Sequence, residues 1–314
     1  MKPLSNILAL FIILILILSG VTNSDAGNRS GTTSEPFLKI STSARGVGVG
    51  GAQVAIAEGV SSIAYNPAGM LSVRDWGTGC TYTAWFAGIQ HSYVGAIKNI
   101  PGVGAIGVSL TMLTTDDIQE TTPSQPEGTG LSFRASDYAV SIAYARQVTD
   151  QFRVGINAKY IKSYLYNTEI GASSVAFDIG TLYDIPILKC HLGVALTNIG
   201  KDVKFIDEQY SIPTALRFGV MVDLYKESAH SVVSILQISR VNDADEQYNL
   251  GAEYVFNNLI SLRGGYKFAY DQEDFAGGFG VKMNAFGFDG SLDYGYNNFK
   301  DLPGTHAFSI EFNF

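Results

Sequence analysis

Beyond residue 74 the chain alternates between apolar or aromatic side chains and small, polar or charged ones. A period of two is the pattern of a β-strand whose two faces meet different surroundings. Leu216–Leu224 shows it clearly, with Leu, Phe or Val at every second position, and Tyr248–Phe256 repeats it. We count 14 such segments between residues 74 and 314, so the sequence predicts an all-β region there.

Alternation alone also suits a soluble β-sandwich, but the length and the ends of these segments favour a membrane barrel. Many run to roughly 10 residues, which a tilted membrane strand needs, whereas soluble strands average nearer 5 or 6. Aromatic residues such as Trp85, Tyr225 and Tyr270 gather at their ends, as in the interfacial girdles of barrels. The 34 Gly, 17 Tyr and 18 Phe residues, against only 16% charged residues, fit the same class.

The connections between these segments alternate in length. Asn257–Asn258 and Asn284–Ala285 are short, whereas Thr114–Gly130, Lys162–Ser173 and Asn198–Ser211 are long and polar. Short turns on one side and long loops on the other, with an even strand count, are typical of outer-membrane barrels. We therefore predict a 14-stranded antiparallel transmembrane β-barrel over residues 74–314. We expect it in the outer membrane of a Gram-negative bacterium, with the N- and C-termini periplasmic.

The first 26 residues predict a secretory signal peptide. Lys2 supplies positive charge, Ile7–Leu18 is an unbroken apolar run, and Ser24–Ala26 is a small-x-small cleavage site. The alternative is an uncleaved anchor, since Ser19–Val21 extends the run. Residues 27–36 are polar and without periodicity, and we expect a flexible periplasmic tail there.

Between the tail and the first strand, residues 37–73 show no strand pattern. Closely spaced glycines permit tight backbone packing, and Asn66-Pro67-Ala68-Gly69 is strong turn chemistry. We predict a compact plug, or hatch, of short helices and loops held inside the barrel. Its motif residues are either structural or take a direct part in opening a passage; they are Arg45, Gly48, Gly50, Gly51, Asn66, Pro67, Ala68 and Gly69.

The plug stretch also carries a resemblance to a known family. Its order, FL-x-I, then S-A-R-G-x-G-x-G-G-A-x-V-A, then S-S-I-x-Y-N-P-A-G-M, resembles the N-terminal pattern of the PorV/PorQ family. Phrases such as Leu196–Gly200 and Leu262–Tyr266 extend the resemblance along the chain. That family is related to FadL, the outer-membrane transporter of long-chain fatty acids, which is a 14-strand barrel with an N-terminal hatch. The last segment, His306–Phe314, resembles the terminal signal that the barrel-assembly machinery reads in bacteria.

Lumen-facing charged residues are the remaining candidate site residues: Asp178, Arg217, Glu253 and Arg263. We expect most of them to pair across strands and to hold plug and wall together, and Glu253 and Arg263 flank one tight turn. The predicted outer loops are acidic, as in Asp243–Glu246. They are either simply solvated or bridge to lipopolysaccharide through divalent cations.

Catalytic and cofactor chemistry is not recognisable. The four His residues are scattered and Cys80 and Cys190 lie far apart, so we predict no metal site and no cofactor. The two cysteines are either small apolar wall residues or a disulfide. No Ser–His–acid trio or P-loop is found, so we predict no catalytic residue and no enzyme activity. The net charge of -8 argues against a nucleic-acid partner.

Two functions remain. The first is passive uptake or binding of hydrophobic, fatty-acid-like small molecules through a plugged FadL-type barrel. The alternative, implied by the resemblance, is a non-enzymatic PorV-like carrier in type IX protein secretion, with long loops such as Thr114–Gly130 binding the exported protein. The expected partners are outer-membrane lipid and lipopolysaccharide, the barrel-assembly machinery through the strand ending at Phe314, and a hydrophobic ligand or a secreted protein.

Overall fold

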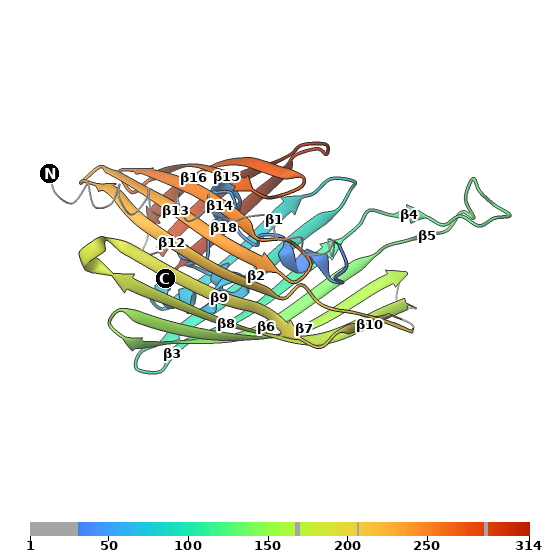
Figure 1. Cartoon of the computed structure of the whole chain (residues 1–314), viewed down its shortest axis with the longest axis horizontal. Helices are drawn as coiled ribbons and strands as arrows, with labels where there is room; N and C mark the ends of the chain where they lie inside the picture. The colour runs from blue at the N-terminus through green and yellow to red at the C-terminus, as the bar shows by residue number, and fades with distance from the viewer. Residues whose placement is uncertain (1–30, 167–169, 206, 286–287) are drawn as a thin grey trace. The chain divides into compact units, whose positions relative to one another are not determined.

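Fourteen antiparallel strands close into one barrel (Figure 1), which confirms the predicted fold class. The structure is a computed structural model, and it describes residues 31–166, 170–205, 207–285 and 288–314. The predicted signal peptide and the first part of the predicted tail lie outside the described residues. Each barrel strand pairs with its neighbours in chain order, and β1 pairs with β18 to close the wall.

The barrel strands run from 9 to 16 residues in length. They are β1 (Trp76–Ala84), β2 (Gln90–Ile100), β3 (Gly104–Thr114), β6 (Ser136–Thr149), β7 (Phe152–Tyr166), β8 (Ile170–Ile185), β9 (Cys190–Gly200), β12 (Ala215–Lys226), β13 (His230–Val241), β14 (Gln247–Phe256), β15 (Ile260–Phe268), β16 (Glu273–Ala285), β17 (Phe288–Phe299) and β18 (Thr305–Asn313).

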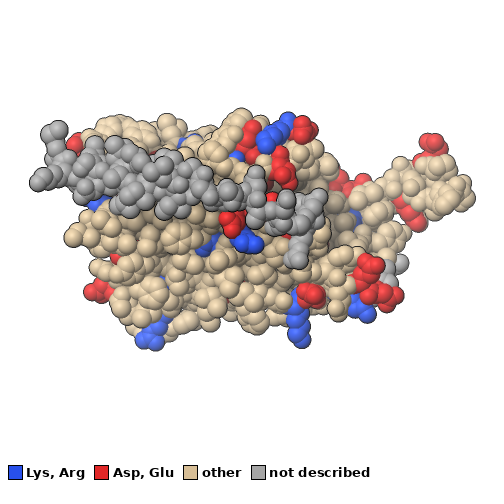
Figure 2. Space-filling view, viewed as in Figure 1, with Lys and Arg blue, Asp and Glu red and all other residues tan. Residues whose placement is uncertain are grey.

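Apolar side chains face outward from this barrel. Val108 in β3 is 50% exposed and Ile142 in β6 is 64% exposed, while Gly107 and Ser109, the neighbours of Val108, are buried. On the face seen in Figure 2, most of the wall is uncharged and the charged side chains gather mainly toward the ends. An apolar exterior around a small and polar interior is the arrangement of a membrane β-barrel. None of the helices in the described ranges is long and apolar enough to span a membrane.

The two ends of the barrel differ, as the connection lengths predict. At one end, here called the short-turn end, β2–β3, β12–β13 and β14–β15 are joined by residues 101–103, 227–229 and 257–259. At the other, the long-loop end, residues 115–135 contain a hairpin of β4 (Ile118–Gln119) and β5 (Ser132–Phe133) that projects beyond the barrel (Figure 1). Residues 201–214 contain a second small sheet, β10 (Val203–Phe205) with β11 (Glu208–Tyr210).

One predicted long loop is wrong. Most of Lys162–Ser173 continues the wall, since β7 runs to Tyr166 and β8 starts at Ile170. The polar composition of this stretch suggested a loop, but lumen-facing positions of a strand take polar residues equally well. Ser163, for example, lies buried on the inner face of β7.

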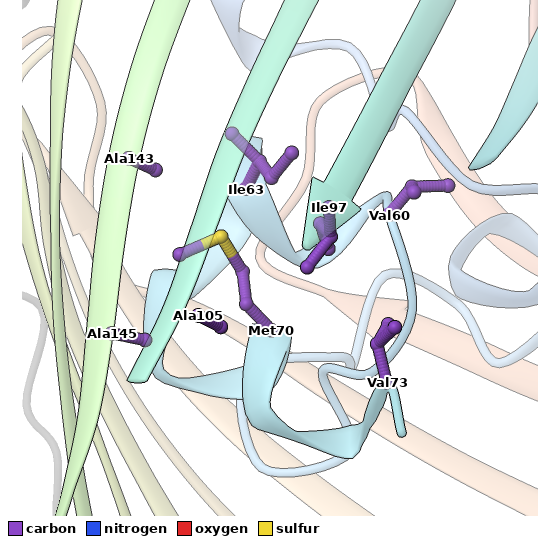
Figure 3. Close-up of a cluster of buried hydrophobic side chains, with 8 residues drawn as sticks. All are labelled: Val60, Ile63, Met70, Val73, Ile97, Ala105, Ala143 and Ala145. Carbon is purple, nitrogen blue, oxygen red and sulfur yellow. The ribbon is translucent and has the colours of Figure 1, made fainter. Parts of the chain in front are cut away.

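The plug lies inside the barrel and is built of short helical pieces. They are η1 (Pro36–Lys39), α2 (Ala44–Gly48), α3 (Ser62–Tyr65) and η2 (Pro67–Ser72), and a further single turn, η3 (Pro186–Leu188), belongs to the β8–β9 connection. Figure 3 shows how Met70 and Ile63 of the plug meet small wall residues, Ala105 and Ala143 among them, in one apolar cluster. Small side chains on the wall leave the space that the plug fills.

Candidate functional site: the plug and the lumen cavity

The glycines of the plug lie where its backbone touches the wall. Gly50 has a φ of +69°, a conformation that favours glycine. Its backbone packs on Gly265 of β15, where an added Cβ would lie 2.4 Å from the backbone nitrogen of Gly50. Gly48 meets Gly278 of β16 in the same way, with its would-be Cβ 3.2 Å from the Gly278 Cα. The glycine-rich motif is therefore a docking surface for strands β15 and β16.

The Asn66–Gly69 turn fastens the plug to the wall between β7 and β8. The Asn66 amide donates to the carbonyls of Val54 and Thr181, at 3.0 Å and 3.1 Å. Its own oxygen accepts from Ala68 N and caps η2, whose first residue is Pro67. Because Asn66 bonds both to another plug segment and to β8, this turn joins plug and wall.

Three of the predicted site residues lie in one charge network. Glu253 and Arg263 are opposite each other on β14 and β15, with Arg263 Nε 2.7 Å from Glu253 Oε1. Arg45 of the plug reaches the same carboxylate, with Nη2 2.7 Å from Oε2. Burial disfavours the charged form of Arg45, but the carboxylates of Glu253 and Glu58 outweigh it and hold the pKa of Arg45 above its ordinary value. The network thus ties the plug electrostatically to the wall.

Asp178 belongs to a second, separate cluster. It pairs with Lys159 of β7 at 2.9 Å and accepts from the backbone N–H of Asn198 at 2.7 Å. Asn157 donates both to Asp178 and to the plug carbonyl of Ile63. The ladder between β8 and β9 is irregular here, and Asn198 takes a φ of +59°. Asp178 therefore holds an irregular piece of wall against α3.

The lumen-facing amides Gln237 and Asn249 were not predicted from the sequence. Gln237 of β13 accepts from the backbone N–H groups of Gln53 and Val54, at 3.1 Å and 3.0 Å. Asn249 of β14 donates to Gly50 O at 2.7 Å. Asn and Gln at inward positions in the middle of apolar-out strands are the signal that identifies such residues, because irregular plug backbone needs hydrogen-bond partners.

At the short-turn end, two wall side chains hydrogen-bond the backbone of one plug residue, Val60. Glu311 of β18 accepts from Val60 N at 3.3 Å, and Tyr93 of β2 donates to Val60 O at 2.6 Å. The small cavity beside these bonds, about 60 Å³, is lined by charged residues of both plug and wall, including Arg45, Glu58 and Asp293. The space past the plug is thus narrow and polar.

A larger cavity of about 480 Å³ lies toward the long-loop end. Its apolar lining combines plug residues with residues near the strand ends: Phe37, Ile40, Val47, Trp85, Ile89, Leu113 and Val241. Its polar lining includes Gln237 and Tyr270 and five charged residues: Lys39, Asp137, Arg217, Lys267 and Glu273. Burial raises the pKa of the Tyr270 phenol above its ordinary value. Its exposed lining surface is more apolar than polar, and a concave site that combines apolar side chains with convergent polar groups suits a small molecule.

The start of the described chain borders this cavity. Ser34 N donates to Ser211 O at 2.9 Å, and Lys39 pairs with Asp243 at 2.9 Å. Phe37 is buried in an apolar cluster with Ile161 and Ile212. Residues 31–36, which fall within the predicted periplasmic tail, therefore lie bonded at the long-loop end, whereas Phe314 bonds to Trp76 at the short-turn end.

Other candidate chemistry does not assemble. Among the described residues, no three His, Cys, Asp or Glu side chains are grouped so that they could hold a metal ion. Cys80 and Cys190 are free thiols rather than the disulfide that was one alternative. Of the acidic loop residues, Asp117, Asp243 and Glu273 already have basic partners in Arg134, Lys39 and Lys267.

An apolar exterior, a closed 14-strand wall and a bonded plug define the class of plugged outer-membrane β-barrels. Within this class, the family model described as type IX secretion system protein PorV matches residues 23–243. The chain belongs to this family, as the plug motif predicted. The sequence matches no curated protein significantly.

Solved structures with the same fold include hydrocarbon channels and transporters and a FadL homologue. The CymD monoaromatic hydrocarbon channel is 14% identical, with a TM-score of 0.58 over 87% of this chain and 97% of CymD. The toluene transporter TbuX of Ralstonia pickettii is 14% identical, with a TM-score of 0.59 over 87% and 98%. A FadL homologue of Pseudomonas aeruginosa is 10% identical, with a TM-score of 0.55 over 87% and 98%. At these identities the likeness shows a shared fold.

Proposed function

We propose that this protein binds a hydrophobic small molecule in the lumen and passes it passively across the outer membrane. The observation that carries the proposal is the cavity of about 480 Å³ at the long-loop end, with its apolar lining and the plug below it. The solved structures of the same fold include a hydrocarbon channel and a toluene transporter. No catalytic residue is assigned, because binding and passage require none.

Passage in this proposal requires movement of the plug. The space beside the plug at the short-turn end is only about 60 Å³ and is lined by charged groups. A hydrophobic molecule does not cross such a space without large desolvation costs. The plug motif residues, Gly48, Gly50, Gly51 and Asn66 to Gly69, then act as the contacts that break and re-form.

The test is equilibrium binding of radiolabelled hexadecanoate and toluene to the purified barrel, followed by uptake into proteoliposomes. Leu113→Trp fills the cavity from β3, and the matched control Val108→Trp places the same ring on the outward face of that strand. We expect Leu113→Trp alone to abolish binding. A wild-type barrel that neither binds nor passes either compound contradicts the proposal.

A second function, a carrier in type IX protein secretion, is favoured by the family match over residues 23–243. In a carrier, the projecting β4–β5 hairpin would bind the exported protein. Crosslinking from a photoreactive residue at Ser124, in the hairpin, tests it, with the same residue at Asn258, in a short turn, as the control. Specific capture of an exported protein from Ser124 supports the carrier function.

We further propose that the long-loop end faces the cell exterior and that the strand ending at Phe314 is read by the barrel-assembly machinery. The length asymmetry of the connections supports this orientation. Cysteine substitutions at Ser124 and Asn258, labelled in intact cells with an impermeant maleimide, test it. Labelling of Asn258→Cys but not Ser124→Cys contradicts the proposed orientation. In this orientation, the outer face of the barrel wall contacts membrane lipid and lipopolysaccharide.

A further inference from the structure

Three Lys or Arg side chains of the barrel strands are buried among the described residues, and they differ in their partners. Lys159 pairs with Asp178, and Arg263 pairs with Glu253 and Asp293. Arg217, which is only 8% exposed, makes no ion pair with any described carboxylate. It is therefore the buried cation without a carboxylate at ion-pair distance among the described residues; Asp137, which also lines the large cavity, makes no ion pair with it.

The surroundings of Arg217 hold its guanidinium in place without neutralising it. One nitrogen, Nη1, donates to Thr197 Oγ1 at 2.7 Å. The guanidinium carbon lies 4.8 Å from the ring centroid of Tyr65, which is on the plug. The cross-strand neighbours of Arg217 are Ala195 and Ser239, both uncharged. An arginine has five N–H donors, so most of its donors remain available.

An uncompensated buried charge is costly, and an arginine does not escape this cost by losing its proton. Arg217 lines the cavity of about 480 Å³ and also the small one of about 20 Å³ next to it. The same large cavity is lined by Phe37, Trp85 and Leu113. An occupant with an apolar body and one anionic group satisfies both parts of this lining, because a guanidinium binds carboxylate or phosphate with two parallel hydrogen bonds.

We propose that Arg217 is the specificity-determining residue of the cavity and that it selects single-chain amphiphiles bearing a carboxylate, sulfonate or phosphate group over neutral hydrophobic molecules. This inference rests on the proposed function, since it assigns the ligand class of the same cavity. Tyr65 places the guanidinium against the plug, so the bound anion lies next to the element that must move.

The test uses the full-length barrel in a non-ionic detergent, with the fluorescence of Trp85 as the signal because this ring lines the cavity. The background variant Trp76→Phe removes the other tryptophan, which is at the short-turn end and is 52% exposed. The probes are 11-bromoundecanoate and its neutral analogue 11-bromoundecanol, whose bromine quenches a nearby indole. We expect the carboxylate to bind roughly 10- to 100-fold more tightly than the alcohol, as hydrogen bonds to a charged group allow.

The variant Arg217→Met keeps the apolar length of the side chain and removes the charge. We expect it to bind the two probes equally, with the affinity for the alcohol unchanged. The matched control is Lys39→Met, because Lys39 lines the same cavity but already pairs with Asp243. This control should keep the preference for the carboxylate.

The outcomes separate the two proposals. If both probes quench Trp85 but the wild-type barrel binds them equally, or if Arg217→Met keeps the preference, the role of Arg217 is overturned while the cavity remains a binding site. If neither probe quenches Trp85, the proposed function fails as well. The comparison of the two probes on the wild-type barrel stands even if Arg217→Met does not fold.

A brominated phosphatidylglycerol, added as a third probe, distinguishes a free amphiphile from a membrane lipid, since both carry the same anionic chemistry. We expect no quenching by this two-chain lipid because the cavity is sized for one chain. Arg217-dependent quenching by it would overturn the single-chain part of the proposal.

Discussion

Arg263 is held by two carboxylates, those of Glu253 and Asp293, and is almost fully enclosed between wall and plug. Without Arg263, Glu253 keeps Arg45 but Asp293 loses its ion-pair partner, and a buried charge left without its partner costs about 3–5 kcal/mol. We expect Arg263→Met to lower, by many degrees, the temperature at which the folded barrel loses its fast migration on a gel. The matched control is Arg74→Met, because Arg74 pairs with Asp289 at an exposed site and such pairs contribute about 0–1 kcal/mol. Equal melting of the two variants would show that the network does not stabilise the barrel.

Glu35 makes the attachment of the first described residues sensitive to pH. It is buried beside η1, and burial raises the pKa of its carboxyl to about 7, with the nearby Asp137 adding to the rise and the Ser163 hydroxyl opposing it. Because this pKa lies above the ordinary value of 4.5, the stabilisation is complete below pH 4.5 and is lost as the pH rises through about 7. We expect amide exchange over residues 31–40 to be slower at pH 5.5 than at pH 8.5.

The substitution Glu35→Gln removes this titration, so exchange over residues 31–40 should become nearly independent of pH between these values after correction for the intrinsic rate. The control is Glu120→Gln in the projecting hairpin, which leaves Glu35 in place. Unchanged pH dependence in Glu35→Gln would place the titrating group elsewhere, with Asp137 the next candidate.

At the scale of elements, the docking of α2 and of the two residues after it depends on strands that present glycine, namely Gly265 of β15, Gly278 of β16 and Gly295 of β17. An added methyl at Gly265 meets the plug backbone at 2.4 Å, whereas one at Gly264, the adjacent residue of β15, meets nothing within 4 Å. We expect Gly265→Ala to displace the glycine segment of the plug and to raise the conductance of the barrel in planar bilayers. Gly264→Ala should behave as the wild type. If Gly265→Ala has the conductance and stability of the wild type, the plug accommodates the added methyl and still blocks the barrel.

The strands were predictable because the membrane imposes one rule on every second residue, as in Ile106, Val108 and Leu110. The strand ends near Lys162 and Ser173 were not predictable, because polar residues suit both a loop and the lumen face of a strand. The plug was predictable as irregular backbone from Gly50 and Asn66. The wall residues that bind the plug, Gln237 and Asn249, were not predictable. Alternation shows that a side chain faces the lumen, but it does not show which plug backbone group that side chain bonds.

The position of Arg217 illustrates the same limit for the candidate site. Its place on the inward face of β12 follows from the alternation, but its lack of a carboxylate partner depends on the strand order and register. Arg217 has no carboxylate partner because the residues opposite it on the two adjacent strands, Ala195 and Ser239, are neutral. Pairing across strands therefore determined which of the four predicted charged residues became a candidate for ligand binding.

At the scale of the whole molecule, the two proposed functions use different parts of the protein. The cavity lies within the barrel and is lined by plug and wall, whereas β4–β5 projects from the long-loop end and contributes no residue to the cavity lining. The hairpin begins beyond Thr115 and Ala135, whose backbones bond to each other. Replacing residues 118–133 by Asn-Gly should therefore leave the barrel and its cavity intact, because that dipeptide forms a tight turn between paired strands.

We expect this deletion to abolish capture of exported proteins while leaving binding of 11-bromoundecanoate within about twofold of the wild type. A second variant, in which residues 118–133 become a Gly/Ser stretch of equal length, separates the sequence of the hairpin from its reach. Loss of capture in both variants with unchanged ligand binding assigns the two functions to separate surfaces. Loss of ligand binding in the deletion would show instead that the hairpin shapes the cavity, and capture that survives in both variants would exclude the hairpin as the carrier surface.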